Sequence, residues 1–476
     1  MKQILLLYIL CLTTCAIQAQ IKLPKIIGSN MVIQQGKPIS IWGSALPDTP
    51  ISVQFNGQTQ KTVTNKQGNW NVQFLPMKAN KLPQTMIIKS RKEKLELKNI
   101  LIGEVWLASG QSNMEYTMKL HHHYKKPRHG KDIQQEEFEK ARLPLMRILH
   151  VEKSSEADSL PTKGWQNINH ESLATLSATA YFFGKTLIDS LGIPVGIISS
   201  SVGGTQIETW TPEEAYTASP LFKTKIKEHK LNDVQIARHF NPMIREIIPF
   251  TLKGFIWYQG ETNLMAGSID SYPDLQRTLV ESWRSLWKDT SLPFYYVQIA
   301  PHTYSQRRRF HINNWESLPR FWEKQTGCMQ IPHTGMAVTT DLVDDVTDIH
   351  PSYKWEVGRR LALWALSHDY GYKQLVYSGP QYRTMHIEGN KIILEFDHVG
   401  SGLTTNNGKA PEWFQIAGEN NRFYQAEAII KANKIILSSN KVQHPINVRF
   451  AWDEIARPNL INQEGLPAVP FRTDNL

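Results

Sequence analysis

A serine that follows an apolar run near residue 100 has the setting of a nucleophile. The segment Gly110-Gln-Ser-Asn-Met114 comes directly after 100–108, an apolar stretch that predicts a buried strand. In an open α/β sheet, ligand chemistry gathers outside the carboxyl ends of the strands, which would place Ser112 at that edge. The segment is not the Gly-x-Ser-x-Gly elbow of α/β-hydrolases, because position 114 is Met. A nucleophilic Ser112 therefore needs a base and oxyanion donors from elsewhere in the chain.

Three later segments carry candidates for these groups. The strand predicted over 195–199 precedes Gly203 and Gly204, the strand over 252–258 precedes Asn263, and the strand over 335–339 precedes an acidic loop that contains His350. A further strand over 293–300 and helices over 173–190, 273–288 and 354–367 alternate with these strands, which favours a parallel sheet. The strand ends of such a sheet lie along one edge, so we expect the four segments to form one site.

The residue types in these segments suit acyl transfer. A serine hydroxyl is a poor nucleophile at neutral pH, and His350 is the candidate general base. A backbone N–H of the glycine turn and the Asn263 amide are candidate donors to a tetrahedral oxyanion, each contributing about 3 kcal/mol. The base also needs a partner for its second ring nitrogen.

The regions on either side of the α/β pattern have β character. Short alternating runs separated by turn signals predict a β domain over 20–99, the α/β pattern fills 100–375, and β character returns over 376–476. The chain of 476 residues is 41% hydrophobic, as expected for a soluble protein of two or three domains. Its net charge of +10 comes without a long Lys/Arg tract or a nucleic-acid motif, so we expect no nucleic-acid partner.

The N-terminus predicts export. Residues 1–19 combine a lysine, a short apolar core and small residues, which is typical of a signal peptide, and no stretch is long enough to span a membrane. We therefore expect a periplasmic or secreted protein, with a lipid-anchored form through Cys15 as the less favoured alternative. Only Cys328 remains after cleavage, which excludes an intramolecular disulfide and a cysteine-based metal site.

Four blocks of the chain resemble SGNH hydrolases, and within that superfamily the sialic-acid-specific acetylesterases. The blocks are Trp106–Met114, Gly203–Trp210, Trp257–Asn263 and Asp348–Pro351. The order and spacing of all four make the resemblance specific, and flanking motifs extend it over nearly the whole chain. It implies a flavodoxin-like parallel sheet of five strands with helices on both faces, flanked by sandwich-like β regions.

The resemblance also implies roles for the residues. Ser112 would be the nucleophile and His350 the base, with the Ser112 N–H, an N–H at Gly203 or Gly204 and the Asn263 amide as oxyanion donors. The broad SGNH pattern places Asp three residues before His, where this chain has Thr347. Asp348 is the favoured partner of His350. Asp345, Asp344 or a backbone carbonyl are the alternatives, the last leaving a Ser-His dyad.

The implied function is removal of O-acetyl groups from sialic acids through a serine acetyl-enzyme, without a metal or organic cofactor. The alternatives are an esterase for acetylated xylan or another polysaccharide, and a glycan-binding protein without catalysis. Arg307–Arg309 follow a predicted strand at the same edge and are candidates for a sialate carboxylate. His121–His123 lack partner ligands nearby in the sequence, which favours a solvated loop over a metal site.

Overall fold

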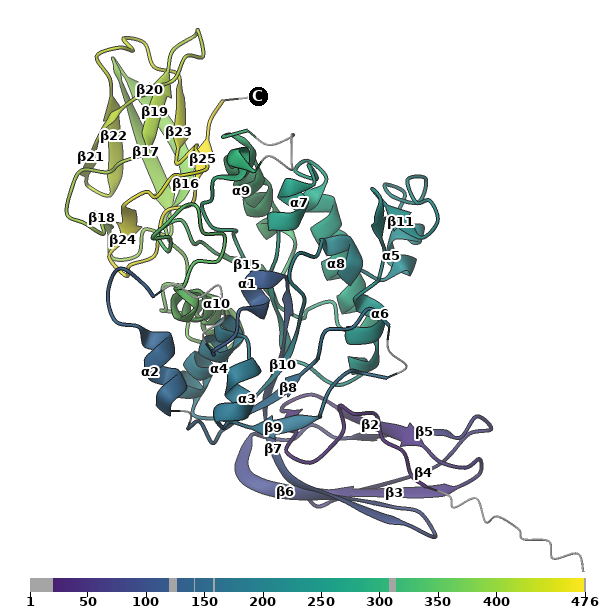
Figure 1. Ribbon diagram of the computed structural model, residues 1–476. Coiled ribbons are helices and arrows are strands. Elements are labelled where there is room, and N and C mark those ends of the chain that lie inside the picture. The colour runs from purple at the N-terminus through teal and green to yellow at the C-terminus, as the bar shows by residue number, and fades with distance from the viewer. Residues whose placement is uncertain (1–19, 120–125, 141, 157–158, 308–313, 475–476) are drawn as a thin grey trace, which may run out of the picture.

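A central, mostly parallel sheet organises the middle of the chain (Figure 1). The computed structural model describes residues 20–119, 126–140, 142–156, 159–307 and 314–474. The strand order is β15-β14-β13-β7-β10-β8-β9, and all neighbours are parallel except β8 and β9. The strands are β7 (Lys94–Gly110), β8 (Met146–His150), β9 (Trp165–Asn167), β10 (Val195–Ser201), β13 (Gly254–Tyr258), β14 (Phe294–Val297) and β15 (Thr334–Ala337).

The parallel part of the sheet has one strand more than expected. Within this strand order six strands of the described residues run parallel, and the additional one is β8, which pairs with β10. Outside the order, the short strand Val32–Gln34 of the N-terminal region also pairs parallel with β7. The expected number of five is therefore wrong. Strand β8 has only five residues and includes Arg147 and His150, so it does not stand out as an apolar run in the polar stretch around it.

Helices cover both faces of this sheet. Figure 1 shows α4 and α10 on one side and α8 and α9 on the other. The helix expected over 173–190 is two helices, because the Ser177 hydroxyl accepts a hydrogen bond from the Ala180 N–H and begins a new helix there. The helices are α1 (Ser112–Glu115), α2 (Ile133–Lys140), α3 (His170–Thr175), α4 (Ala178–Leu191), α5 (Glu213–Ala218), α6 (Phe240–Met243), α7 (Glu261–Met265), α8 (Tyr272–Leu286), α9 (Ser317–Gly327) and α10 (Lys354–Asp369).

The N-terminal β region shares a strand with the central sheet. The first part of β7 pairs with β6, and its second part lies between β10 and β13. Buried side chains of 21–102 belong to the same hydrophobic core as those of the α/β part. The strands of this region are β1 (Val32–Gln34), β2 (Ile39–Ser44), β3 (Pro50–Phe55), β4 (Gln58–Val63), β5 (Asn69–Phe74) and β6 (Asn80–Lys89).

The C-terminal β region has a hydrophobic core of its own, between Ile392 and Ala468. It lies at the opposite end of the molecule from the N-terminal region in Figure 1. Ion pairs of 2.8 Å between Arg449 and Glu316 and 2.9 Å between Arg472 and Glu323 attach it to the α9 segment. Its strands are β16 (Gln381–Glu388), β17 (Lys391–Asp397), β18 (Leu403–Thr405), β19 (Phe414–Ala417), β20 (Tyr424–Gln425), β21 (Glu427–Lys431), β22 (Lys434–Ser438), β23 (Asn447–Phe450), β24 (Leu460–Asn462) and β25 (Phe471–Arg472).

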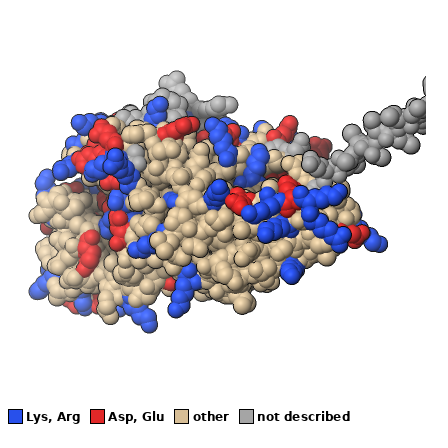
Figure 2. Space-filling view, turned by 90° about the horizontal axis from the view of Figure 1, so that it is seen from below, with Lys and Arg blue, Asp and Glu red and all other residues tan. Residues whose placement is uncertain are grey.

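Charged side chains are dispersed over the face seen in Figure 2, with carboxylates among the lysines and arginines. Within the described ranges, none of the helices has the length and apolar character needed to cross a membrane. Cys328 is free and buried, and burial raises the pKa of its thiol to about 12. The predicted signal peptide lies outside the described residues.

Candidate active site

Ser112 stands where β7 passes into the short helix α1. Gly110 allows this turn, because its φ is +142° and a Cβ atom there would lie 2.2 Å from the Tyr258 carbonyl oxygen of β13. The Gln111 N–H donates to the same carbonyl oxygen at 2.9 Å. The turn is thus fixed to the neighbouring strand, and Ser112 follows it directly.

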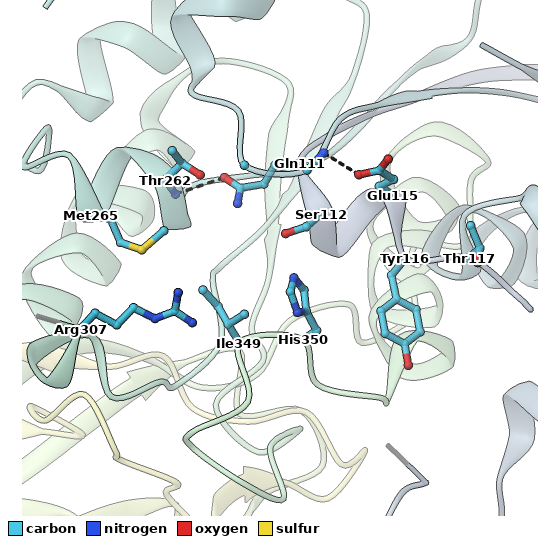
Figure 3. A pocket seen from close by; sticks show the side chains of 12 residues that line it. Gln111, Ser112, Glu115, Tyr116, Thr117, Thr262, Met265, Arg307, Ile349 and His350 are labelled. Atoms are coloured by element: carbon cyan, nitrogen blue, oxygen red, sulfur yellow. Dashed lines mark hydrogen bonds between the residues drawn. The ribbon is translucent and has the colours of Figure 1, made fainter. Parts of the chain in front are cut away.

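A cavity of about 510 Å³ brings several of the predicted site residues together. Ser112, Gly203, Gly204 and His350 line it, and Figure 3 shows the imidazole of His350 pointing toward the Ser112 side chain. The remaining lining residues are Gln111, Glu115, Tyr116, Thr117, Thr262, Met265, Arg307 and Ile349. Residues from five distant segments therefore meet at the carboxyl edge of the sheet.

The glycine turn after β10 packs closely against the serine. A Cβ atom at Gly203 would lie 3.3 Å from the Ser112 Cβ and 2.8 Å from Glu115 Oε2. The Gly203 N–H donates to Glu115 Oε2 at 2.5 Å, an interaction drawn in Figure 3. Gly204 has a φ of +72° with open space around it. The Gly203 N–H is thus engaged by a carboxylate, and Gly204 remains as the second candidate donor of this turn.

Asn263 is not among the residues that line the cavity. Its side chain is fully buried, and its Nδ2 donates to Glu208 Oε2 at 3.0 Å. Its Oδ1 accepts from Gln259 Nε2 at 2.6 Å and from the Ile207 N–H at 3.0 Å. Asn263 therefore lies after the predicted strand with its amide held by these bonds, one of its two N–H groups binding Glu208, and its role as an oxyanion donor stays a prediction.

The acidic loop before His350 engages its carboxylates in several ways. Asp348 Oδ1 accepts from the backbone N–H of His350 at 2.9 Å. Asp345 Oδ1 accepts from the Thr347 N–H at 2.9 Å, and Asp344 Oδ1 accepts from the Tyr353 hydroxyl at 2.8 Å. Asp348 therefore fixes the backbone of the candidate base, and its role toward the imidazole stays a prediction.

Arg307 contributes a positive charge to the cavity wall. Its guanidinium lies near Ile349 in Figure 3, and its Nε donates to His302 Nε2 at 2.9 Å. Burial and the adjacent arginine lower the pKa of His302 to about 4, so His302 is neutral and can accept this bond. Glu454 of the C-terminal region accepts from the Ser305 N–H at 2.9 Å and fixes the same loop. Arg308–Arg309 and His121–His123 lie outside the described residues.

Two buried ionisable residues beside Ser112 have no role assigned from the sequence. Glu261 and Lys354 are 1% and 0% exposed. Burial raises the pKa of Glu261 and lowers that of Lys354 to about 7. The position of Glu261 in the third block was the signal for a role, whereas Lys354 follows His350 by four residues and looked like an ordinary helix residue.

The residues that line the cavity lie within a segment that matches a known protein family. Residues 102–367 match the model of a family described as carbohydrate esterase, sialic acid-specific acetylesterase. Sialate O-acetylesterase of Homo sapiens is 30% identical over 403 residues, covering 78% of this chain and 75% of that protein. The Mus musculus protein of the same name is 27% identical over 428 residues, covering 78% and 77%.

A solved structure resembles the whole architecture. The crystal structure of a carbohydrate acetylesterase from Xanthomonas citri has a TM-score of 0.84 and 32% sequence identity to this chain. The match covers 96% of this chain and 100% of that one. The similarity therefore includes the α/β part and the β regions at both of its ends.

Proposed function

Since this chain belongs to the sialic acid-specific acetylesterase family of carbohydrate esterases, we propose that it hydrolyses O-acetyl groups on sialic acids through a serine acetyl-enzyme. The observation that carries the proposal is the placement of Ser112 and His350 beside each other in one cavity at the carboxyl edge of the sheet. The glycine turn against Ser112 supports it.

The reaction proceeds in two halves. His350 accepts the Ser112 proton as Oγ attacks the acetyl carbonyl carbon, and a tetrahedral oxyanion forms. Collapse of this intermediate breaks the bond to the sugar oxygen, which leaves as a hydroxyl with the proton from His350. Water then attacks the acetyl-serine with His350 as base, and acetate and free Ser112 are released.

The oxyanion needs hydrogen-bond donors that face the cavity. We assign this role to the backbone N–H groups of Ser112 and Gly204, because both residues line the cavity. The Gly203 N–H takes part only when it exchanges Glu115 for the oxyanion. The Asn263 amide is the third proposed donor, because one of its two N–H groups binds Glu208 and its oxygen accepts from the Ile207 N–H, which fixes the orientation of the amide.

Arg307 supports a sialic acid over a neutral sugar as the substrate. A sialic acid carries a carboxylate, and a guanidinium can bind it through two parallel charge-assisted hydrogen bonds. Arg307 lines the same cavity as Ser112, opposite Tyr116 in Figure 3. The predicted signal peptide supports a location where such glycans occur outside the cytoplasm.

The test of the proposed substrate is acetate release from O-acetylated sialic acids compared with acetylated xylan, with p-nitrophenyl acetate as the substrate without a sugar. We expect a higher kcat/KM on the sialic acid. Equal or faster release from xylan would contradict the sialate assignment and support a polysaccharide esterase. Failure to hydrolyse any of the three would contradict the catalytic role of this cavity.

Arg307→Met is expected to raise KM for O-acetylated sialic acid about 10- to 100-fold, since a hydrogen bond to a charged group contributes about 1.5–3 kcal/mol. Hydrolysis of p-nitrophenyl acetate, which has no carboxylate, should change little. Arg277→Met on the exposed side of α8 is the matched control. An equal loss on both substrates would show that Arg307 maintains the cavity and does not bind the carboxylate.

A further inference from the structure

One buried amide connects the serine turn to the histidine loop. Asn113 follows Ser112 directly and is fully buried. Its Nδ2 donates to Glu261 Oε1 at 2.6 Å and to the Ile349 carbonyl oxygen at 3.0 Å. Its Oδ1 accepts from Lys354 Nζ at 2.8 Å. A single side chain of the serine turn thus connects it to two other segments that contribute to the cavity, those of Glu261 and Ile349.

The same contacts fix the backbone on both sides of His350. Asn113 holds the carbonyl oxygen of Ile349, which precedes the histidine, and Lys354 Nζ donates to the carbonyl oxygen of Pro351, which follows it, at 2.5 Å. The loop is therefore held on both sides of His350, by Asn113 of the serine turn and by Lys354, which is hydrogen-bonded to Asn113. A shift of Asn113 or Lys354 would move His350 relative to Ser112.

The cost of burying these groups argues against a purely structural role. A buried ammonium or carboxylate loses hydration, and apolar side chains of similar volume often stabilise a core as well or better. Lys354 Nζ lies 4.7 Å from the Tyr116 ring centre and 5.6 Å from that of Tyr258, both within cation–π range. Glu261 and Asp348 oppose the lowering of the Lys354 pKa that burial causes. Two buried ionisable groups that contact the residue after Ser112 therefore suit a role in fixing the geometry of this turn.

We propose that Asn113, Glu261 and Lys354 are positioning residues that hold the imidazole of His350 in line with Ser112 Oγ. The inference rests on the proposed function, because it gives Ser112 and His350 their roles. Glu261 orients the Asn113 amide so that one N–H reaches Ile349, and Lys354 occupies the amide oxygen. This arrangement assigns a purpose to the asparagine of the first block and the glutamate of the third.

The variants that test it are Asn113→Ala, Lys354→Met, Glu261→Gln and Glu261→Leu. The glutamine keeps an oxygen acceptor for the Asn113 amide, whereas the leucine of similar volume does not. Asn462→Ala is the matched control, since Asn462 is also fully buried and its Nδ2 donates to the Ser378 and His398 carbonyl oxygens in the C-terminal region. Thermal unfolding of each variant shows that it is folded at the assay temperature.

The measurements are kcat and KM for p-nitrophenyl acetate and the rate at which phenylmethylsulfonyl fluoride labels Ser112. We expect Asn113→Ala and Lys354→Met to lower kcat and the labelling rate about 100-fold, with KM nearly unchanged, because a displacement of about 1 Å has effects of this size. Glu261→Gln should keep at least about tenfold more kcat than Glu261→Leu. If Asn113→Ala does not fold, the comparison of kcat between Glu261→Gln and Glu261→Leu still tests the positioning role.

Losses no larger than that of Asn462→Ala, or losses confined to KM, would overturn the inference. So would equal kcat values for Glu261→Gln and Glu261→Leu. These outcomes differ from failure of the proposed function, in which the unmodified protein itself would show no hydrolysis that depends on Ser112. The unmodified protein and Ser112→Ala are therefore measured in the same series.

Discussion

Ser112→Ala is expected to lower kcat/KM for p-nitrophenyl acetate by at least about 10⁴-fold, because the variant has no group that can form the acetyl-enzyme. The residual rate should exceed that of the uncatalysed reaction, since the backbone N–H at position 112 and the Gly204 N–H remain in place. The same variant should form no acetylated or sulfonylated serine by mass spectrometry. The folded state should be preserved, because Ser112 lines an open cavity.

Ser109→Ala is the matched control for this variant. Ser109 lies three residues earlier on β7, is fully buried and is not among the residues that line the cavity. Its activity should stay close to that of the unmodified protein. Substantial esterase activity in Ser112→Ala would assign the nucleophile to another residue and would remove the basis for the proposed mechanism.

His350→Ala is expected to cause a loss of similar size, because serine and base act as a unit. The double variant with Ser112→Ala should therefore be no slower than either single variant, which is the kinetic signature of two residues in one step. His386→Ala on the partly exposed strand β16 is the control for removal of an imidazole. Additive losses in the double variant would contradict a shared proton transfer.

Asp348→Ala separates a triad from a dyad within the same experiment. Asp348 holds the His350 backbone N–H, so some loss of kcat follows from loop movement alone. A decrease in kcat of about 10⁴-fold, as for removal of the acid of a catalytic triad, would show that Asp348 orients the His350 imidazole. A loss below about threefold would assign the support of His350 to another group.

Part of the fold was visible in the chain because burial leaves a periodic signature. The alternation of charged and other residues over 94–99 indicates one exposed face, and the continuous apolar run from Ile100 indicates burial on both faces. The short strand β8 lacked this signature, since Arg147 and His150 interrupt it. Pattern alone therefore recovers long buried strands and misses a short strand with polar residues near the edge of the sheet.

The candidate site likewise contains residues that the sequence could predict and others that it could not. Ser112, Gly203, Gly204 and His350 were predicted to meet, and they line one cavity because parallel strand ends share an edge. The orientation of Asn263 was not predictable, since it depends on Glu208, a residue 55 positions earlier in the chain. Lys354 was also missed, because a lysine in the first turn of a helix is ordinarily solvated. Its burial beside the Tyr116 and Tyr258 rings arises only when distant segments of the chain pack together.

Strand β7 joins the N-terminal β region to the central sheet, so the N-terminal region is harder to replace than the C-terminal one. It begins in the N-terminal β region and ends at the turn before Ser112, so no cut near residue 99 leaves both parts whole. The C-terminal region, with its separate core, is attached by loops and ion pairs and is the natural place for fusion or exchange with another module. Engineering of the N-terminal region, by contrast, acts on the same continuous backbone that carries Ser112.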